Sequence, residues 1–357
     1  MLPFMIEPVV DRVDQLTPEW VTGALQSAGH ELVVTSAETE PIGTGQMGMT
    51  YRLRLAYDGE PGPATLVAKV AGPSEELRAL VAPGYAAELG FYRRLADGLA
   101  VRVPRCWYAA ITDDNTAFTL LLEDAAPAIP GVQADGCTVT QAEAALDNLV
   151  GLHAPRWNDP ELLGIDTLMR TTEESAEMMG AALRGANVGF LERYDSALAD
   201  DDSATLRDVA DAIVDWQLAR PEPFTVVHGD YRLDNLLFAP DDDEVIAVDW
   251  QAAAVGPALR DVAYFLGTSL HTEDRRSTEE RLVAGYHNAL VKRGVAGYDA
   301  DRCWDDYRLG QLQGPMITVI GCMYASGERS EASDAMFLAM ARRSCASIRE
   351  LRSLELV

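Results

Sequence analysis

The segment TVVHGDYRLDNLLF (225–238) gathers side chains that could do acid–base or metal chemistry. His228, Asp230 and Asn235 lie on one short stretch between two strand-like runs, and Asp249 follows the later apolar run EVIAV. Carboxylate and amide oxygens are the ligands that Mg²⁺ prefers, and Mg²⁺ usually takes one or two carboxylates together with substrate phosphates. Because Asp, Asn and Gly are also common turn formers, the cluster could alternatively be a set of solvated turns.

The spacing of these residues favours chemistry over a solvated turn. An Asp, four residues, an Asn, and then an Asp after a short strand–turn–strand is the layout that kinases use for the catalytic base and the metal ligands. We therefore expect Asp230 to meet an acceptor hydroxyl, and Asn235 and Asp249 to bind the metal ion. His228 is expected to be structural, and PDDDE (240–244), which joins the two short strands, is expected to be a solvated turn.

A lysine inside an apolar strand pattern is the second candidate group. Lys69 lies in TLVAKVA and is one of only two lysines in the chain, the other being Lys292. A buried lysine is costly unless it is paired, although a lysine at a sheet edge can reach solvent. A compact ammonium suits a point contact with nucleotide phosphates better than a planar guanidinium does. Glu88, on the helical pattern AAELGFYRRL, is its expected partner, because Leu89 and Tyr92 make the adjacent face apolar.

Three glycines precede a strand in PIGTGQMGMTYRLRL, namely Gly43, Gly45 and Gly48. In a dinucleotide-binding fold the last glycine opens a helix. Here it opens TYRLRLA, in which apolar residues alternate with arginine, and a period of two predicts a strand. A glycine loop between strands can lay backbone amides over nucleotide phosphates, as in kinases. The pattern alone fits an ordinary glycine-rich hairpin equally well.

The elements that must position these residues form a strand-rich first third and a helix-rich remainder. A small lobe is predicted over 1–123, with an N-terminal helix, a five-stranded sheet and one further helix. The specific patterns are a helix at 17–29, strands at 49–57, 65–71, 105–112 and 117–123, and a helix at about 84–97. Such segregation of strands and helices predicts an α+β fold in two unequal lobes.

The remainder of the chain is predicted to be mainly helical. A hinge is expected at 124–130, where AAPAIPG breaks the pattern, and a helical C-terminal lobe over 131–357 carries the loop 228–235 and Asp249. Helical patterns occupy roughly 139–153, 171–198, 203–219, 277–293, 301–326 and 331–353, with only two short strands, near 236–238 and 245–248.

Composition narrows the possible partners and the compartment. A formal net charge of −27 disfavours nucleic acid as a partner, since nucleic-acid binding needs a basic face. No apolar run approaches the roughly 20 residues needed to span a bilayer, and MLPFMIEPVVDR does not resemble a signal peptide. The five cysteines are scattered and contain no C-x-x-C pair, which favours a reducing cytoplasm over a disulfide framework or a zinc site.

These motifs together resemble the aminoglycoside phosphotransferase and choline kinase superfamily, the small-molecule relatives of protein kinases. HGDYRLDN and VDW are specific for the superfamily, whereas ELGFYRRL, LLLED and GPALRDVAYFL are most similar to its ecdysteroid-kinase-like branch. The resemblance runs from about residue 40 to 290. It implies a protein-kinase-like fold and transfer of phosphate from ATP or GTP, with Mg²⁺, to a hydroxyl of a small molecule.

The resemblance also implies roles for individual residues. Lys69 and Glu88 would form the ion pair, Asp230 would be the catalytic Asp, and Asn235 and Asp249 would be the Mg²⁺ ligands. The backbone of the stretch that contains Leu122, Glu123 and Ala125 would hold the base of the nucleotide, and Asp261 would brace the catalytic loop. The glycine loop is closer to the protein-kinase pattern than in many small-molecule kinases, so which of its amides meets phosphate stays open.

A protein kinase is disfavoured, because DWQAAAVGPALRD reaches the next helix within a dozen residues and no Ala-Pro-Glu follows. The alternative to an active enzyme is a catalytically silent nucleotide-binding protein of the same fold. The acceptor is not readable beyond a small alcohol such as an amino sugar, an amino alcohol or a sterol. Aromatic side chains from the helical segments could line its site, although at helical spacing such residues more often belong to a core; they are Trp250, His271, Trp304, Tyr307 and Tyr324.

Overall fold

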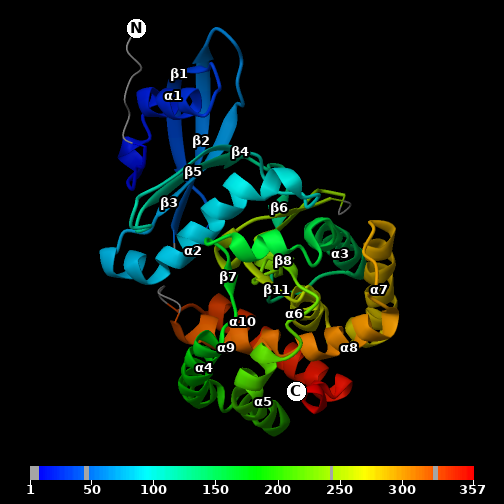
Figure 1. Cartoon of the computed structure of the whole chain (residues 1–357). Coiled ribbons are helices and arrows are strands. Elements are labelled where there is room, and N and C mark those ends of the chain that lie inside the picture. Colours follow the sequence, from blue (N-terminus) through cyan, green and yellow to red (C-terminus); the bar gives the residue numbers. More distant parts are fainter. Residues whose placement is uncertain (1–7, 44–47, 242–243, 325–328) are drawn as a thin grey trace. The chain divides into compact units, whose positions relative to one another are not determined.

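The computed structural model describes residues 8–43, 48–241, 244–324 and 329–357, and the whole chain is drawn in Figure 1. The chain divides into two compact units. Unit 1 comprises Met1–Asp97 and Val103–Ala126, and unit 2 comprises Gly98–Arg102 and Pro127–Val357. Among the described residues, no helix has the length and hydropathy that a membrane span requires.

Unit 1 is built on an antiparallel sheet in the order β1-β2-β3-β5-β4. Its strands are β1 (Val33–Pro41), β2 (Gly48–Asp58), β3 (Thr65–Ala71), β4 (Cys106–Ile111) and β5 (Phe118–Glu123). Successive side chains of a strand point to opposite faces. In β3 the buried Leu66, Ala68 and Val70 therefore share one face, which packs with Trp20 and Leu25 of α1 (Pro18–Ser27). Lys69 consequently lies on the opposite face of β3.

The second helix of unit 1, α2 (Glu75–Arg94), begins nine residues earlier than the predicted 84–97. Ser74 caps its first turn by accepting a hydrogen bond from the backbone N–H of Leu77. The prediction was wrong because Pro83 and Gly84 resemble a helix start, whereas the helix continues through Pro83 and forgoes one backbone hydrogen bond. The buried residues of α2 all lie at or beyond Tyr85, so its first half carries no apolar periodicity.

Unit 2 contains eight described α-helices. They are α3 (Val139–His153), α4 (Glu173–Tyr194), α5 (Asp200–Leu218), α6 (Leu259–Ser269), α7 (Thr272–Lys292), α8 (Ala300–Gly310), α9 (Gln313–Tyr324) and α10 (Glu331–Leu351). The single helix predicted at 301–326 was wrong, because the chain turns between α8 and α9. Pro315 lies in the first turn of α9, where its missing N–H costs nothing but where it could not continue a preceding helix.

The prediction of only two short strands in this part of the chain was also wrong. Five occur there among the described residues, and a sixth, β6, lies in the predicted hinge; the six form the three-stranded sheets β10-β9-β6 and β7-β11-β8. They are β6 (Ile129–Pro130), β7 (Met169–Arg170), β8 (Thr225–Val227), β9 (Leu236–Phe238), β10 (Val245–Ala247) and β11 (Ala254–Gly256). Strands of two or three residues are too short to show a period of two, so sequence patterning cannot detect them.

Helices α4, α5, α9 and α10 enclose one apolar core, and α4 and α5 lie side by side (Figure 1). Phe190, Ile213 and Trp216 are fully buried in this core, and Val319 of α9 packs with them. Trp216 also donates its indole N–H to the backbone carbonyl of Leu309 at 2.7 Å. Burying such side chains contributes about 1.5–3 kcal/mol each, so this core is a main source of stability for unit 2.

The short segment Gly98–Arg102 links α3 to the strand that precedes Asp249. The N–H of Ala100 donates to the carbonyl of Gly151 on α3 at 3.0 Å, and the N–H of Ala247 on β10 donates to the carbonyl of Arg102 at 3.0 Å. A Cβ at position 151 would lie 2.6 Å from the carbonyl oxygen of Ala100. The helix and the segment can approach this closely only because residue 151 is glycine.

We expect Gly151→Ala to lower the free energy of unfolding by about 1–3 kcal/mol, because the colliding atoms are backbone and cannot rotate away. Gly285→Ala on α7 is the matched control, since nothing lies within 4 Å of a Cβ at that position. The control should be neutral or stabilising by up to about 1 kcal/mol, from helix propensity alone. Thermal unfolding of both variants is the measurement. A Gly151→Ala protein as stable as Gly285→Ala would contradict the close approach.

Candidate active site

In unit 1 the structure brings Lys69 and Glu88 together. The Nζ of Lys69 on β3 lies 2.7 Å from Oε2 and 2.9 Å from Oε1 of Glu88 on α2. The lysine side chain is 13% exposed and the glutamate side chain 1%. Removing one partner of a buried pair leaves an uncompensated charge, so the two residues are energetically dependent on each other. The lysine side chain thus keeps a small exposed fraction while its charge is paired.

The other predicted nucleotide residues of unit 1 lie at the start of β2 and the end of β5. Gly43 precedes β2 with a φ of +75°, Gly48 is the first residue of β2, and Gly45 lies outside the described residues. Leu122 is buried, and the backbone N–H of Glu123 donates to the carbonyl of Arg105 at 2.8 Å. Ala125 follows in a non-regular segment.

In unit 2 the carboxylate of Asp261 holds the backbone of the His-Gly-Asp turn. Asp261 lies in the first turn of α6 and is fully buried. Its Oδ2 accepts from the N–H of His228 at 2.6 Å, and its Oδ1 accepts from the N–H of Gly229 at 3.0 Å. Gly229 has a φ of +80°, and a Cβ there would collide with the carbonyl of Ala252. The turn therefore requires glycine at this position and a carboxylate beneath it.

Two histidines complete this support, and their hydrogen bonds fix their tautomers. His228 accepts from the N–H of Asp230 through Nδ1 at 3.3 Å, so its Nε2 carries the proton that it donates to Val248 at 3.0 Å. His153 on α3 accepts from the Tyr286 hydroxyl through Nδ1 at 2.6 Å. Its Nε2 donates to Asp261 at 3.3 Å. Both rings are buried, so His228 has the geometry of a structural group rather than of a base.

The side chain of Asp230 is 27% exposed and accepts hydrogen bonds on both oxygens. Tyr264 of α6 donates its hydroxyl to Oδ1 at 2.8 Å. The amide Nδ2 of Asn235 and the Nε of Arg232 donate to Oδ2 at 3.1 and 3.3 Å. Burial is the largest single influence on Arg232 and opposes its charged form, but Asp230 and the neighbouring Tyr264, Asp234 and Asp249 together outweigh it and raise the pKa of the guanidinium above its ordinary value. The carboxylate is thus held in one orientation while remaining accessible.

A backbone hydrogen bond brings the segments of Asn235 and Asp249 together. The N–H of Val248 donates to the carbonyl oxygen of Asn235 at 3.0 Å, which places the end of β10 beside the loop. Because the Asn235 Nδ2 faces Asp230, the amide oxygen is the atom available to a cation. Asp249 adopts a left-handed conformation, with φ 65° and ψ 70°, which is strained for a non-glycine residue and common at functional sites.

This donor set fits Mg²⁺. One carboxylate and one neutral amide oxygen are the hard ligands that Mg²⁺ combines with phosphate oxygens and water. The described residues contain no group of three or more His, Cys, Asp or Glu side chains arranged to hold a metal ion. A closed protein cage, of the kind that structural zinc sites use, is therefore not found in the described part of the chain.

Sequence reasoning missed several residues that shape the loop. Gln133 accepts from the N–H of Leu233 at 2.9 Å, and its own N–H donates to Asp234 at 3.1 Å. Gln313 of α9 donates to the carbonyl of Gly229 at 3.0 Å. These residues are distant in sequence and belong to no local motif. The only available signal was the position of Tyr264 one helical turn after Asp261.

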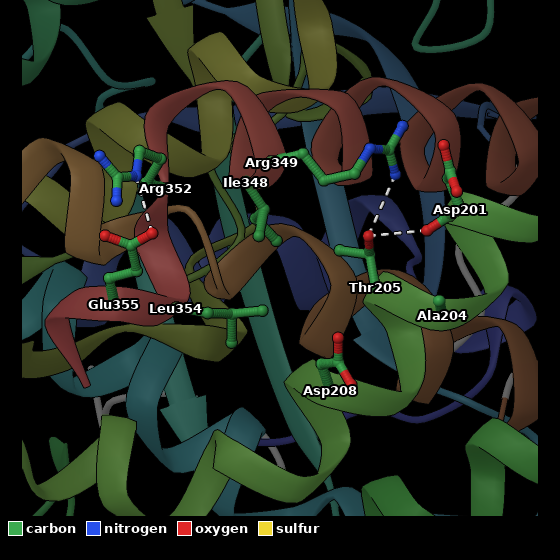
Figure 2. A pocket seen from close by; sticks show the side chains of 9 residues that line it. All are labelled: Asp201, Ala204, Thr205, Asp208, Ile348, Arg349, Arg352, Leu354 and Glu355. Carbon is green, nitrogen blue, oxygen red and sulfur yellow. Dashed lines mark hydrogen bonds and ion pairs between the residues drawn. The ribbon is translucent and has the colours of Figure 1, made fainter.

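Two pockets, each of about 270 Å³, lie away from the predicted catalytic, nucleotide-binding and metal-binding residues. Figure 2 shows one between α5, α10 and the C-terminal turn, where Arg349 donates to Thr205 at 3.1 Å and Arg352 to Glu355 at 2.7 Å. Its arginines are thus already engaged by the protein. The other lies between α7 and α8 and is lined in part by Trp304.

The expected aromatic residues do not share one environment. Trp250 and Tyr307 are fully buried and belong to the core, and Tyr324 is 62% exposed. His271 precedes α7 and is exposed, and Trp304 lines the pocket between α7 and α8. An aromatic acceptor wall that includes Trp250 and Tyr307 is therefore wrong, because fully buried rings cannot line an open site.

Comparison with solved structures identifies the fold. A choline kinase from Cryptosporidium parvum Iowa II aligns with a TM-score of 0.55 and 10% identity over 90% of this chain and 91% of that chain. A Plasmodium vivax ethanolamine kinase aligns with a TM-score of 0.54 and 13% identity over 98% of this chain and 93% of that chain. The GDP complex of wild-type aminoglycoside 2'-phosphotransferase-IIIa aligns with a TM-score of 0.53 and 13% identity over 92% of this chain and 98% of that chain. These matches confirm the prediction of an α+β, two-lobed, kinase-like fold.

Curated relatives match only over short stretches. Acyl-CoA dehydrogenase family member 10 of Mus musculus is 46% identical over 56 residues, which is 15% of this chain and 5% of that protein. Acyl-CoA dehydrogenase family member 11 of Gallus gallus is 29% identical over 111 residues, which is 29% of this chain and 14% of that protein. The chain therefore matches only a small part of the length of either relative.

The model of the phosphotransferase enzyme family matches residues 39–302. This range includes every predicted catalytic, nucleotide-binding and metal-binding residue and most of the chain. The predicted resemblance to aminoglycoside phosphotransferases and choline kinases is confirmed, and the chain belongs to the phosphotransferase enzyme family.

Proposed function

We propose that this phosphotransferase moves the terminal phosphoryl group of ATP or GTP, with Mg²⁺, to a hydroxyl of a small molecule. The observation that carries the proposal is the arrangement around Asp230. Its accessible carboxylate accepts hydrogen bonds on both oxygens, one of them from Asn235. The backbone of Asn235 in turn bonds to Val248, next to Asp249. Neighbours of the same fold include choline and ethanolamine kinases and a GDP complex of an aminoglycoside phosphotransferase, which supports a nucleotide donor and an alcohol acceptor.

Catalysis in this proposal consists of positioning and charge neutralisation, because phosphoryl transfer asks little covalent chemistry of the protein. Asp230 accepts a hydrogen bond from the acceptor hydroxyl, orients its oxygen toward the phosphorus and receives its proton as the new O–P bond forms. In the same step the bond from the terminal phosphorus to the bridging oxygen breaks, and ADP or GDP leaves. Lys69, held by Glu88, contacts the α- and β-phosphates. The amides near Gly43, Gly45 and Gly48 contact phosphate, and the backbone near Leu122, Glu123 and Ala125 binds the base.

Asn235 and Asp249 are the residues that would hold Mg²⁺. A bound Mg²⁺ supplies neutralisation of the phosphate charge, which an acidic protein with a net charge of −27 otherwise repels. This repulsion makes the metal requirement measurable in binding, without reference to turnover. An acceptor that carries a cationic amine, such as an amino alcohol or amino sugar, agrees with the same acidic field, whereas a sterol gains nothing from it.

The metal assignment predicts that ATP binds weakly in the absence of Mg²⁺. We expect Mg²⁺ to tighten ATP binding to the wild type by about tenfold or more, and Asp249→Asn to lose most of this gain while remaining folded. Asn235→Ala should lose less, since it removes a neutral ligand. Calorimetric titration of ATP with and without Mg²⁺, at moderate ionic strength, measures both effects.

Asp241→Asn is the matched control for this experiment. Asp241 is an exposed residue in the turn after β9, so its substitution changes the net charge equally without touching the proposed ligands. It should keep the full Mg²⁺ effect. Equal affinity of the wild type for ATP with and without Mg²⁺ would remove the metal site from the proposal. Metal-dependent binding without transfer to any hydroxyl would favour the catalytically silent alternative.

The ion pair gives an independent prediction. Lys69→Ala and Glu88→Ala should each weaken nucleotide binding, and the double variant should be little worse than the poorer single one, because contacting residues are not additive. Arg54→Ala is the control, since Arg54 forms an exposed pair with Glu40 on the same sheet and exposed pairs contribute little. Nucleotide affinities of the four proteins are compared by calorimetry. Fully additive losses would show that Lys69 and Glu88 act separately.

A further inference from the structure

Tyr264 is a buried polar group that the proposed reaction does not yet use. It lies on α6, three residues after Asp261, and its side chain is fully buried. Residues three apart share a face of a helix. One face of α6 therefore presents two groups to the catalytic loop, with Asp261 holding the backbone of His228 and Gly229 and Tyr264 holding the side chain of Asp230.

We propose that Tyr264 is a positioning residue for phosphoryl transfer, whose hydroxyl fixes the Asp230 carboxylate in the orientation that receives the acceptor hydroxyl. The inference rests on the proposed function, and it adds a residue of the stretch GPALRDVAYFL to which the resemblance assigns no role. Tyr264 acts through Asp230 and does not itself meet the substrate.

The hydrogen bonds around Asp230 distinguish the tyrosine from the other donors. A carboxylate offers about four lone-pair positions, of which Tyr264, Asn235 and Arg232 occupy three, leaving room for one acceptor hydroxyl. Asn235 and Arg232 both donate to Oδ2 and belong to the loop itself, so they move with it. Tyr264 donates the shortest bond, 2.8 Å, to Oδ1 and belongs to a helix packed in the core. It thus ties the carboxylate to a rigid element.

Buried tyrosines commonly find some partner for their hydroxyl, so burial alone does not give Tyr264 a role. The hydroxyl of Tyr307, for example, donates to Glu279 at 2.9 Å, far along the chain from the loop. What sets Tyr264 apart is a partner that is accessible and central to the site. Burial, and next the charge of Asp230, raise the pKa of Tyr264 well above its ordinary value, so the hydroxyl stays a donor at neutral pH.

Tyr264→Phe is the decisive variant, because it removes one oxygen and leaves the ring. We expect kcat to fall by about 10- to 100-fold, in the range for a misplaced catalytic group, with KM for the nucleotide changed by less than about twofold. Tyr307→Phe is the matched control, since it also removes a buried hydroxyl that donates to a carboxylate. It should lower the thermal stability comparably and keep kcat. In an Asp230→Asn background, Tyr264→Phe should cost little more, because the two residues act as one unit.

Each outcome decides between the inference and the proposed function. A folded Tyr264→Phe protein with wild-type kcat, or with a loss no larger than that of Tyr307→Phe, would overturn the inference and leave the proposed function standing. A wild type that transfers phosphate to no hydroxyl compound would overturn both. If Tyr264→Phe does not fold, a crystal structure of the nucleotide-bound wild type decides, and a separation of the tyrosine hydroxyl from Asp230 would refute the positioning role.

Discussion

The geometry of the loop 228–235 depends on one buried carboxylate, that of Asp261. It accepts the backbone N–H groups of His228 and Gly229 and a ring N–H of His153, and it is closed off from solvent. A buried charge is tolerated only when such donors surround it. The turn needs the carboxylate in return, because the N–H groups of His228 and Gly229 have no partner within a helix or a sheet. The carboxylate and the turn therefore stabilise each other.

The site of unit 2 follows from this interaction. Asp261, in the first helical turn of α6, holds the His-Gly-Asp turn. Asp230 can then accept hydrogen bonds from Tyr264 of α6 and from Asn235 of the loop. The backbone bond from Val248 to Asn235 then brings Asp249 to the same place. The contact of Tyr264 with Asp230 and that of Asp261 with the turn both cross more than 30 residues of chain, so the geometry of the candidate site depends on the packing of α6 in unit 2 as well as on the loop.

Sequence patterns identified the candidate residues that lie in local motifs and missed those that contact the loop only through the tertiary fold. Asp230, Asn235 and Asp249 could be found because their spacing is a property of a short local chain, and Lys69 because a lysine in an apolar strand is unusual. Tyr264 and Gln133 contact the loop across long stretches of chain. Nothing near Gln133 in the sequence marks it, and Tyr264 is marked only by its position one helical turn after Asp261. In the fold, Pro83 made the start of α2 appear later than it is. The strands of two or three residues were missed because they are too short to show an alternating pattern.

The central claim is that an Asp230-centred site transfers phosphate to a small hydroxyl compound. The most direct measurement follows a radiolabelled terminal phosphate from ATP and from GTP onto a panel of amino alcohols, amino sugars and sterols, with the wild type and Asp230→Asn. The account predicts Mg²⁺-dependent label on a hydroxyl of at least one class, and a loss of roughly 10²-fold or more in the variant. Label transferred equally fast by Asp230→Asn, or no label on any class by a wild type that binds Mg²⁺ and nucleotide, would contradict it.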